Sequence, residues 1–209
     1  YLLPQLSPSP VPIITILVII IINLQTTESL NNTPTIHDLK RLVTASSLSY
    51  LPLSSIPSSP YNKQIGGYTP VHQVIDPTTE SGATIFRDVD DSNAIIVACR
   101  GSATPRNFAT NLDFELVPAT FLPDLPKGSK VHKGFQRAAY GLWNDVGLGD
   151  KLASVINGDA AGGIGRGGER SVSSVRFTGH SLGGATALLC AAYYASDARG
   201  GGEVTPPLS

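Results

Sequence analysis

A chain of 209 residues is long enough for one domain with a sizeable core. Hydrophobic residues make up 41% and charged residues 15% of it, a balance typical of a folded enzyme and not of a disordered chain. The 15 Lys and Arg against 16 Asp and Glu leave a formal net charge of −1, so nothing favours a nucleic-acid partner. No spacing of His, Cys or acidic residues is typical of a metal site, and the sequence predicts no cofactor.

Residues 1–30 differ in composition from the rest of the chain. Residues 13–22 are uncharged and almost all β-branched. A spanning helix needs about 20 apolar residues, and this run is about half as long. A signal or targeting segment is the favoured interpretation, with a short membrane anchor second and a buried strand third. Residues 31–209 are then the folded domain, and we expect a secreted or membrane-associated protein. The first residue is Tyr1 and there is no Met, which favours a processed product or a fragment.

The predicted domain begins with a helix. Pro34 suits a first helical turn, and Thr35 and Asp38 have the spacing of a capping box before an apolar stripe. Residues 94–99 form a continuous apolar run, which predicts a strand buried on both faces. The other predicted elements are a loop at 51–60, strands at 71–75, 83–87 and 172–178, helices at 135–146, 151–156 and 185–195, and a glycine-rich loop at 157–168. This alternation predicts an α/β domain with a largely parallel central sheet.

Residues 179–183 read Gly-His-Ser-Leu-Gly, a G-x-S-x-G pattern between a predicted strand and a predicted helix. A serine hydroxyl is a weak nucleophile unless it is exposed beside a base, and a very tight strand-to-helix turn exposes it. Only glycine leaves room for such a turn at Gly179 and Gly183. The helix that follows would point free N–H groups and its positive dipole end at a developing oxyanion. The pattern therefore predicts Ser181 as a catalytic nucleophile.

Two further segments add to this pattern. Residues 179–191 read GHSLGGATALLCA, residues 100–108 read RGSATPRNF and residues 131–135 read VHKGF. The three segments resemble, respectively, the nucleophile turn, the oxyanion segment and the H-x-G-F stretch of the fungal-type (class 3) triacylglycerol lipases. These lipases belong to the α/β-hydrolase superfamily. The resemblance covers roughly residues 35–209.

The resemblance implies an α/β-hydrolase core that hydrolyses carboxylic esters, above all acylglycerols, through an acyl-enzyme. Ser181 would be the nucleophile. The backbone N–H of Leu182, and the backbone N–H and hydroxyl of Ser102, would stabilise the oxyanion. Residues 104–112 would form a lid over the site. The implied partner is a lipid or ester substrate at a membrane or droplet interface, with no obligate protein partner.

The pattern is incomplete after the nucleophile. A serine hydrolase of this fold needs an Asp and then a His downstream of the serine. The 28 residues after Ser181 contain Asp197, at the end of the nucleophile helix, and no histidine. Asp197 is expected to be a surface residue. The upstream histidines are expected to be structural; they are His37, His72, His132 and His180. We therefore expect the chain to be truncated before the C-terminal third of the domain.

Three functions remain open. The first is a triacylglycerol lipase or a related carboxylic ester hydrolase. The second is a catalytically dead α/β-hydrolase fragment that lacks the triad Asp and His. The third is a serine peptidase or thioesterase, which residues 100–102 disfavour. Residues 163–168 match G-x-G-x-x-G but precede a strand, so they fail the context of a dinucleotide site. Cys99 and Cys190 are expected to be buried thiols.

Overall fold

The computed structural model describes residues 35–64, 67–89, 94–101, 115–119, 128–158, 172 and 174–197, and the backbone of Ile22–Leu24. The helical elements are α1 (Ile36–Leu48), a short 3-10 helix (Leu53–Ser55), α2 (Pro60–Gln64), α4 (Lys133–Tyr140), a π-helical turn (Gly141–Asp145), α5 (Leu148–Asn157) and α6 (Leu182–Asp197). The strands are β1 (Ile22–Leu24), β2 (Tyr68–Ile75), β3 (Gly82–Asp88), β4 (Ala94–Arg100), β5 (Leu116–Pro118), β6 (Lys130–His132) and β7 (Ser174–Gly179).

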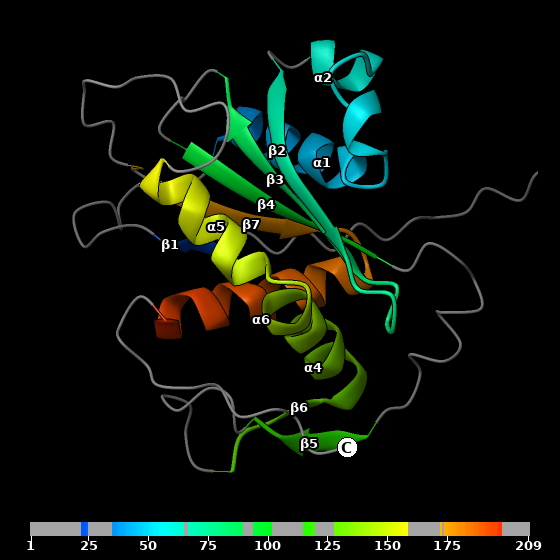
Figure 1. Ribbon diagram of the computed structural model, residues 1–209, viewed down its shortest axis with the longest axis vertical. Helices are drawn as coiled ribbons and strands as arrows, with labels where there is room; N and C mark the ends of the chain where they lie inside the picture. The colour runs from blue at the N-terminus through cyan, green and yellow to red at the C-terminus, as the bar shows by residue number, and fades with distance from the viewer. Residues whose placement is uncertain are drawn as a thin grey trace, which may run out of the picture.

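A five-stranded sheet in the order β1-β7-β4-β3-β2 forms the centre of the molecule (Figure 1). Strands β4 and β7 run parallel, and Cys99 at the end of β4 pairs with Gly179 at the end of β7. The carboxyl ends of these two neighbouring strands therefore meet at one edge of the sheet. In open α/β sheets this edge is where ligands bind.

The sheet is mixed, which corrects the expectation of a largely parallel one. Only β4 and β7 pair in parallel within the described part of the sheet, whereas β2–β3, β3–β4 and β1–β7 are antiparallel. Connections of a few residues, 76–81 and 89–93, join β2, β3 and β4 in sequence. Such short connections produce antiparallel hairpins, because a parallel pair needs a crossover of a dozen or more residues.

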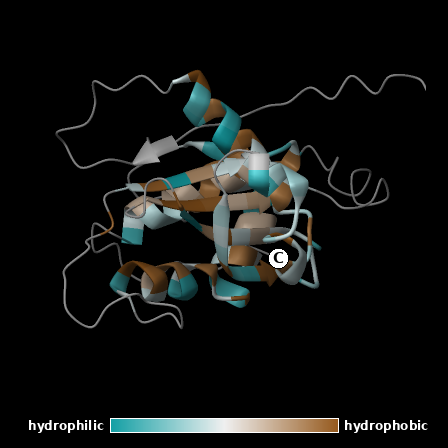
Figure 2. Cartoon of the chain, turned by 90° about the horizontal axis from the view of Figure 1, so that it is seen from above, coloured by the Kyte–Doolittle hydropathy of each residue, from teal (hydrophilic) through white to brown (hydrophobic). Residues whose placement is uncertain are grey.

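Both faces of the central strands are buried, as the apolar run at 94–99 predicts. Along β4, Ile95, Val97 and Cys99 pack into a core shared with α4, α5 and α6. The alternate residues Ile96 and Ala98 pack into a second core under α1. Figure 2 shows the hydrophobic colouring concentrated in these strands. Helices thus cover the sheet on both sides, which holds the ends of β4 and β7 in a rigid frame.

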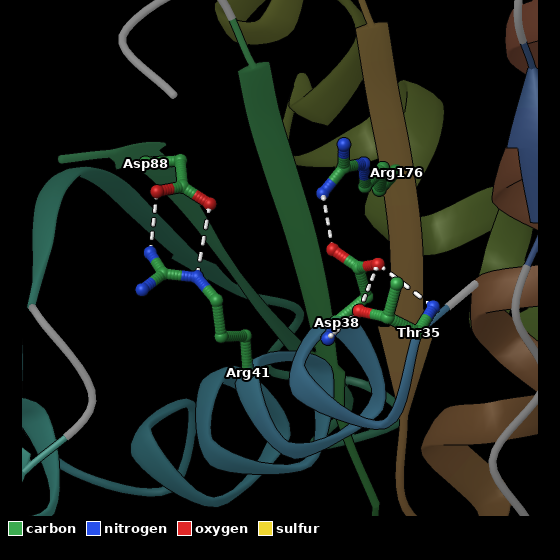
Figure 3. Close-up of polar contacts among 5 residues, drawn as sticks. All are labelled: Thr35, Asp38, Arg41, Asp88 and Arg176. Atoms are coloured by element: carbon green, nitrogen blue, oxygen red, sulfur yellow. Dashed lines mark hydrogen bonds and ion pairs between the residues drawn. The ribbon is translucent and has the colours of Figure 1, made fainter. Parts of the chain in front are cut away.

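The first helix begins with the predicted capping box. The Thr35 hydroxyl accepts a hydrogen bond from the Asp38 N–H at 3.2 Å, and the Asp38 carboxylate accepts one from the Thr35 N–H at 2.9 Å (Figure 3). The Asp38 carboxylate also lies 3.9 Å from the Arg176 guanidinium of β7. The hydrogen bonds from the Thr35 side chain and backbone hold the pKa of Asp38 below its ordinary value.

Replacing Thr35 by Ala is expected to lower the free energy of unfolding by about 1 kcal/mol at pH 7, because the first turn loses the side-chain hydrogen bonds of its cap. Since the folded pKa of Asp38 lies below its ordinary value, its contribution is present at neutral pH and is lost as the pH falls below about 4. Urea denaturation at pH 7 and pH 3 should show a smaller variant effect at pH 3. Thr44→Ala, on the same helix, is the control and should change stability by less than about 0.5 kcal/mol.

The N-terminal segment is described only at Ile22–Leu24. Residues 1–21 and 25–34 lie outside the described residues, so the signal or anchor segment at 1–30 stays a prediction. Its Ile22–Leu24 pairs along β7 as a short strand. No helix in the described ranges is long and apolar enough to cross a bilayer.

Cys99 and Cys190 are free and buried, as predicted.

Candidate active site

Ser181 occupies the turn between β7 and α6. Its backbone lies in the left-handed region, with φ +58°, and its side chain is exposed. For a residue other than glycine this conformation costs of the order of 1–3 kcal/mol and persists only when the surroundings impose it. A serine held in this way between a strand and a helix has the geometry of a nucleophile elbow. The strand-to-helix context predicted from the sequence is therefore present.

The two glycines of the motif are needed because backbone segments pack closely around the turn. A Cβ at Gly179 would lie 2.8 Å from the Cys99 carbonyl oxygen and closer still to the Gly183 carbonyl group. A Cβ at Gly183 would lie 2.8 Å from the Gly101 nitrogen and would also overlap the Cys99 carbonyl oxygen. The start of α6 thus packs directly on the end of β4. Any side chain at either position would push these two elements apart.

The start of α6 leaves one N–H group beside Ser181 available. The Gly183 N–H donates to the His180 carbonyl and the Gly184 N–H donates to the Ser181 carbonyl, both at 2.9 Å. Leu182 is the first helical residue, and its N–H has no partner in the part of the chain that the structure describes. A free N–H at a helix N-terminus favours negative charge nearby. This geometry is suited to an oxyanion formed at Ser181.

Tyr50 bridges the end of β4 and the turn that carries Ser181. No sequence motif points to this residue. The Tyr50 hydroxyl accepts a hydrogen bond from the Gly101 N–H at 3.0 Å and lies 3.2 Å from His180 Nδ1. Gly101 directly precedes Ser102 in the chain. Ser102 itself and the lid expected at residues 104–112 lie outside the described residues.

None of the described histidines lies within hydrogen-bond distance of the Ser181 hydroxyl. His180 contacts Tyr50, as described above. His132 caps α4, where its ring accepts a hydrogen bond from the Phe135 N–H at 3.4 Å and stacks on the Phe135 ring. His37 lies on α1 and His72 on β2. His180 and His132 thus have partners other than Ser181, and a structural role for the four histidines stays a prediction.

Asp197 also has a structural contact. At the end of α6, its carboxylate accepts a hydrogen bond of 2.9 Å from the Trp143 indole nitrogen. The bond ties the last turn of α6 to the π-helical turn, far along the helix from Ser181. The exposed surface acid expected from the sequence therefore has a partner, and its position is not that of a triad acid.

Both cysteines are buried thiols with no exposed sulfur for a reaction. Cys99 lies at the end of β4 and Cys190 on α6, below the turn. A hydrogen bond with Cys99, and then burial, raise the pKa of the Cys190 thiol well above its ordinary value. A thiol reacts as the thiolate, so this shift makes Cys190 inert at neutral pH. Across the described ranges, no three His, Cys, Asp or Glu side chains gather where they could hold a metal ion.

A left-handed serine between a parallel strand and a helix, with helices on both sides of the sheet, defines an α/β-hydrolase fold. The fold of solved lipases is similar. A Rhizomucor miehei lipase propeptide complex has a TM-score of 0.55 and 26% identity over 78% of this chain. A fungal lipase–inhibitor complex has a TM-score of 0.56 and 26% identity over 81% of this chain. These likenesses confirm the α/β-hydrolase core.

The family model for lipase (class 3) matches residues 96–201, slightly more than half of the chain. The chain belongs to this family. A curated lipase of Rhizomucor miehei is 37% identical over 102 residues, which are 49% of this chain and 23% of the relative. A secreted mono- and diacylglycerol lipase of Fusarium solani is 33% identical over 127 residues, which are 61% of this chain and 33% of the relative.

The chain spans a third or less of the curated relatives' length, and 49% and 59% of the two solved chains. The matched part includes the end of β4, the whole of the turn at Ser181 and α6. Family membership is therefore established on the segments that build the candidate site.

Proposed function

We propose that the protein hydrolyses carboxylic ester bonds of acylglycerol lipids, with Ser181 as the nucleophile. The observation that carries this proposal is the exposed serine, held at φ +58° beside the N–H of Leu182 at the start of α6. The Ser181 oxygen attacks the ester carbonyl carbon and its proton passes to a base. The alcohol then leaves, and water hydrolyses the acyl-enzyme.

The oxyanion of the tetrahedral intermediate is stabilised by the Leu182 N–H and, in this proposal, by the N–H and hydroxyl of Ser102. Removing one donor of this kind typically lowers kcat by about 10²–10³-fold. The base and its acid partner are not among the described residues near Ser181. The family relationship supports an Asp and a His in these roles, without identifying them in this chain.

The names of two relatives support the proposed substrate class. One is named a lipase and another a secreted mono- and diacylglycerol lipase. A lipase substrate is insoluble, so we place the reaction at the surface of a membrane or lipid droplet. We also propose that the protein acts outside the cell, which agrees with the apolar segment at residues 13–22.

Replacing Ser181 by Ala is expected to lower the rate of tributyrin and 4-nitrophenyl butyrate hydrolysis by at least about 10³-fold, because the acyl-enzyme cannot form. The rate is measured with the purified full chain by titration of released acid. Ser58→Ala, which removes another exposed hydroxyl, should hydrolyse both esters at the wild-type rate. Equal rates for wild type and Ser181→Ala would contradict the proposed nucleophile.

A catalytically dead α/β-hydrolase that only binds lipid is the second candidate. It is favoured by one observation, the lack of a histidine close to the Ser181 hydroxyl among the described residues. Under this alternative the wild-type chain hydrolyses neither ester but sediments with phosphatidylcholine vesicles that contain diacylglycerol. Turnover that depends on Ser181 would exclude it.

A further inference from the structure

Tyr50 is located where three elements meet. It lies two residues after the end of α1 and is 37% exposed. Its hydroxyl contacts Gly101 at the end of β4 and His180 at the end of β7, at 3.0 and 3.2 Å. Its ring also meets the His180 ring edge-on, with centroids 6.3 Å apart. One side chain thus joins α1 to the carboxyl ends of both parallel strands.

The donor and acceptor groups around the Tyr50 hydroxyl determine the direction of its hydrogen bonds. The Gly101 N–H can only donate, so the Tyr50 oxygen accepts from it. The single hydroxyl proton of Tyr50 is then available for His180 Nδ1. A neutral imidazole that accepts at Nδ1 carries its own proton on Nε2. Tyr50 therefore contacts both the Gly101 backbone and the His180 ring, and when its proton goes to Nδ1 the His180 proton lies on Nε2.

We propose that Tyr50 is a positioning residue for ester hydrolysis, which holds the end of β4 at a set distance from the nucleophile turn. Gly101 is followed by Ser102 and His180 by Ser181, so the bridge connects the neighbours of one proposed oxyanion donor and of the nucleophile. This inference rests on the proposed function. It adds a residue from α1's end, 131 positions before the nucleophile, to the machinery of the site.

The packing at the junction leaves little freedom for another arrangement. A Cβ at Gly101 would lie 2.8 Å from both the His180 carbonyl oxygen and the Tyr50 hydroxyl oxygen. The backbone of Gly101 is thus pressed against the turn on one side and against the hydroxyl on the other. Loss of the hydroxyl removes one of these two restraints. Shifts of about 1 Å between a nucleophile and its oxyanion donors can cost about 10²-fold in rate.

Replacing Tyr50 by Phe keeps the ring and removes only the hydroxyl. We expect kcat for 4-nitrophenyl butyrate to fall about 10- to 100-fold, with KM within about twofold of wild type, because the defect lies in the transition state. Tyr61→Phe is the matched control, since Tyr61 is 64% exposed on α2. Its kcat should equal that of wild type. Thermal unfolding of both variants should occur within about 2 °C of wild type, which separates positioning from a loss of fold.

The nitrogen-15 NMR shifts of the His180 ring report whether the Tyr50 hydroxyl bonds to Nδ1, while the fall in kcat at unchanged KM separates positioning from a purely structural role. In the wild type we expect the proton on Nε2, and in Tyr50→Phe a mixture of both tautomers. A kcat that falls while these shifts stay unchanged would overturn the bridge as the cause. An unchanged kcat in Tyr50→Phe, with Ser181→Ala inactive, would overturn the Tyr50 proposal and leave the proposed function intact. A wild-type chain that hydrolyses no ester would overturn both.

Discussion

Alanine at Gly183 is expected to lower the free energy of unfolding by about 3 kcal/mol or more. In an exposed helix the same change would stabilise the protein by about 0.5–1 kcal/mol. A loss of stability at Gly183 therefore indicates a steric clash. The destabilisation arises because the new methyl group would overlap the backbone of β4, 2.8 Å from the Gly101 nitrogen and closer to the Cys99 carbonyl oxygen. Neither backbone group can rotate away. Guanidinium chloride unfolding, followed by circular dichroism, measures the loss.

Gly158→Ala separates this steric effect from the cost of a left-handed backbone. Gly158 has φ +82°, and an added methyl group there would meet no atom within 4 Å, so only conformational strain of about 1–2 kcal/mol is expected. Gly183→Ala should lose clearly more stability than Gly158→Ala. A Gly183→Ala protein as stable as wild type would mean that β4 and α6 do not approach as closely as described.

Alanine at Asp88 is expected to lower the free energy of unfolding by about 3–5 kcal/mol, because it removes a buried carboxylate that pairs with the buried Arg41 guanidinium. The Arg41 and Asp88 side chains are 5% and 2% exposed and connect α1 to β3 (Figure 3). Arg41 Nε donates to the carboxylate at 3.3 Å, and Nη2 donates to its other oxygen. The Arg41 group also lies 4.9 Å from the centre of the Tyr68 ring.

The exposed pair of Lys133 and Glu115 is the matched control. Its side chains are 38% and 53% exposed at an N–O distance of 2.9 Å, so Glu115→Gln should cost less than about 1 kcal/mol. Urea denaturation of both variants gives the comparison. The double variant Arg41→Met, Asp88→Leu should recover most of the loss, because both charges of this buried pair are removed. Equal, small losses for Asp88→Ala and Glu115→Gln would show that the Arg41–Asp88 pair is not buried.

The parts of the fold predicted from sequence depend on short-range signals. The capping box of Thr35 and Asp38 sets the start of α1 within four residues. The apolar run that begins at Ala94 predicts a strand buried on both faces, and both faces of β4 are buried. The tight turn at Ser181, between a strand and a helix, is predicted from Gly179 and Gly183, which lie two residues on either side of it. Each of these features is determined by neighbours in the chain.

The parts that sequence could not predict depend on contacts between distant segments. The partners of each strand are not encoded in its own residues, and the sheet is mixed where a largely parallel one was expected. Tyr50 follows a helix in a Ser-rich stretch and has no motif spacing to Ser181. Its role arises only when α1 folds against β4 and β7. No pattern in a single sequence reports a hydroxyl that bridges residues 51 and 130 positions away.

As the nucleophile of an α/β-hydrolase site, Ser181 is expected to react with reagents that phosphonylate activated serines. The most direct test is to treat the full chain with a fluorophosphonate, digest it, and locate the adduct by mass spectrometry. We predict one adduct, on the peptide that carries Ser181, which is absent from Ser181→Ala and forms more slowly in Tyr50→Phe. A wild-type protein that forms no adduct, or forms one only at another residue, would contradict the account.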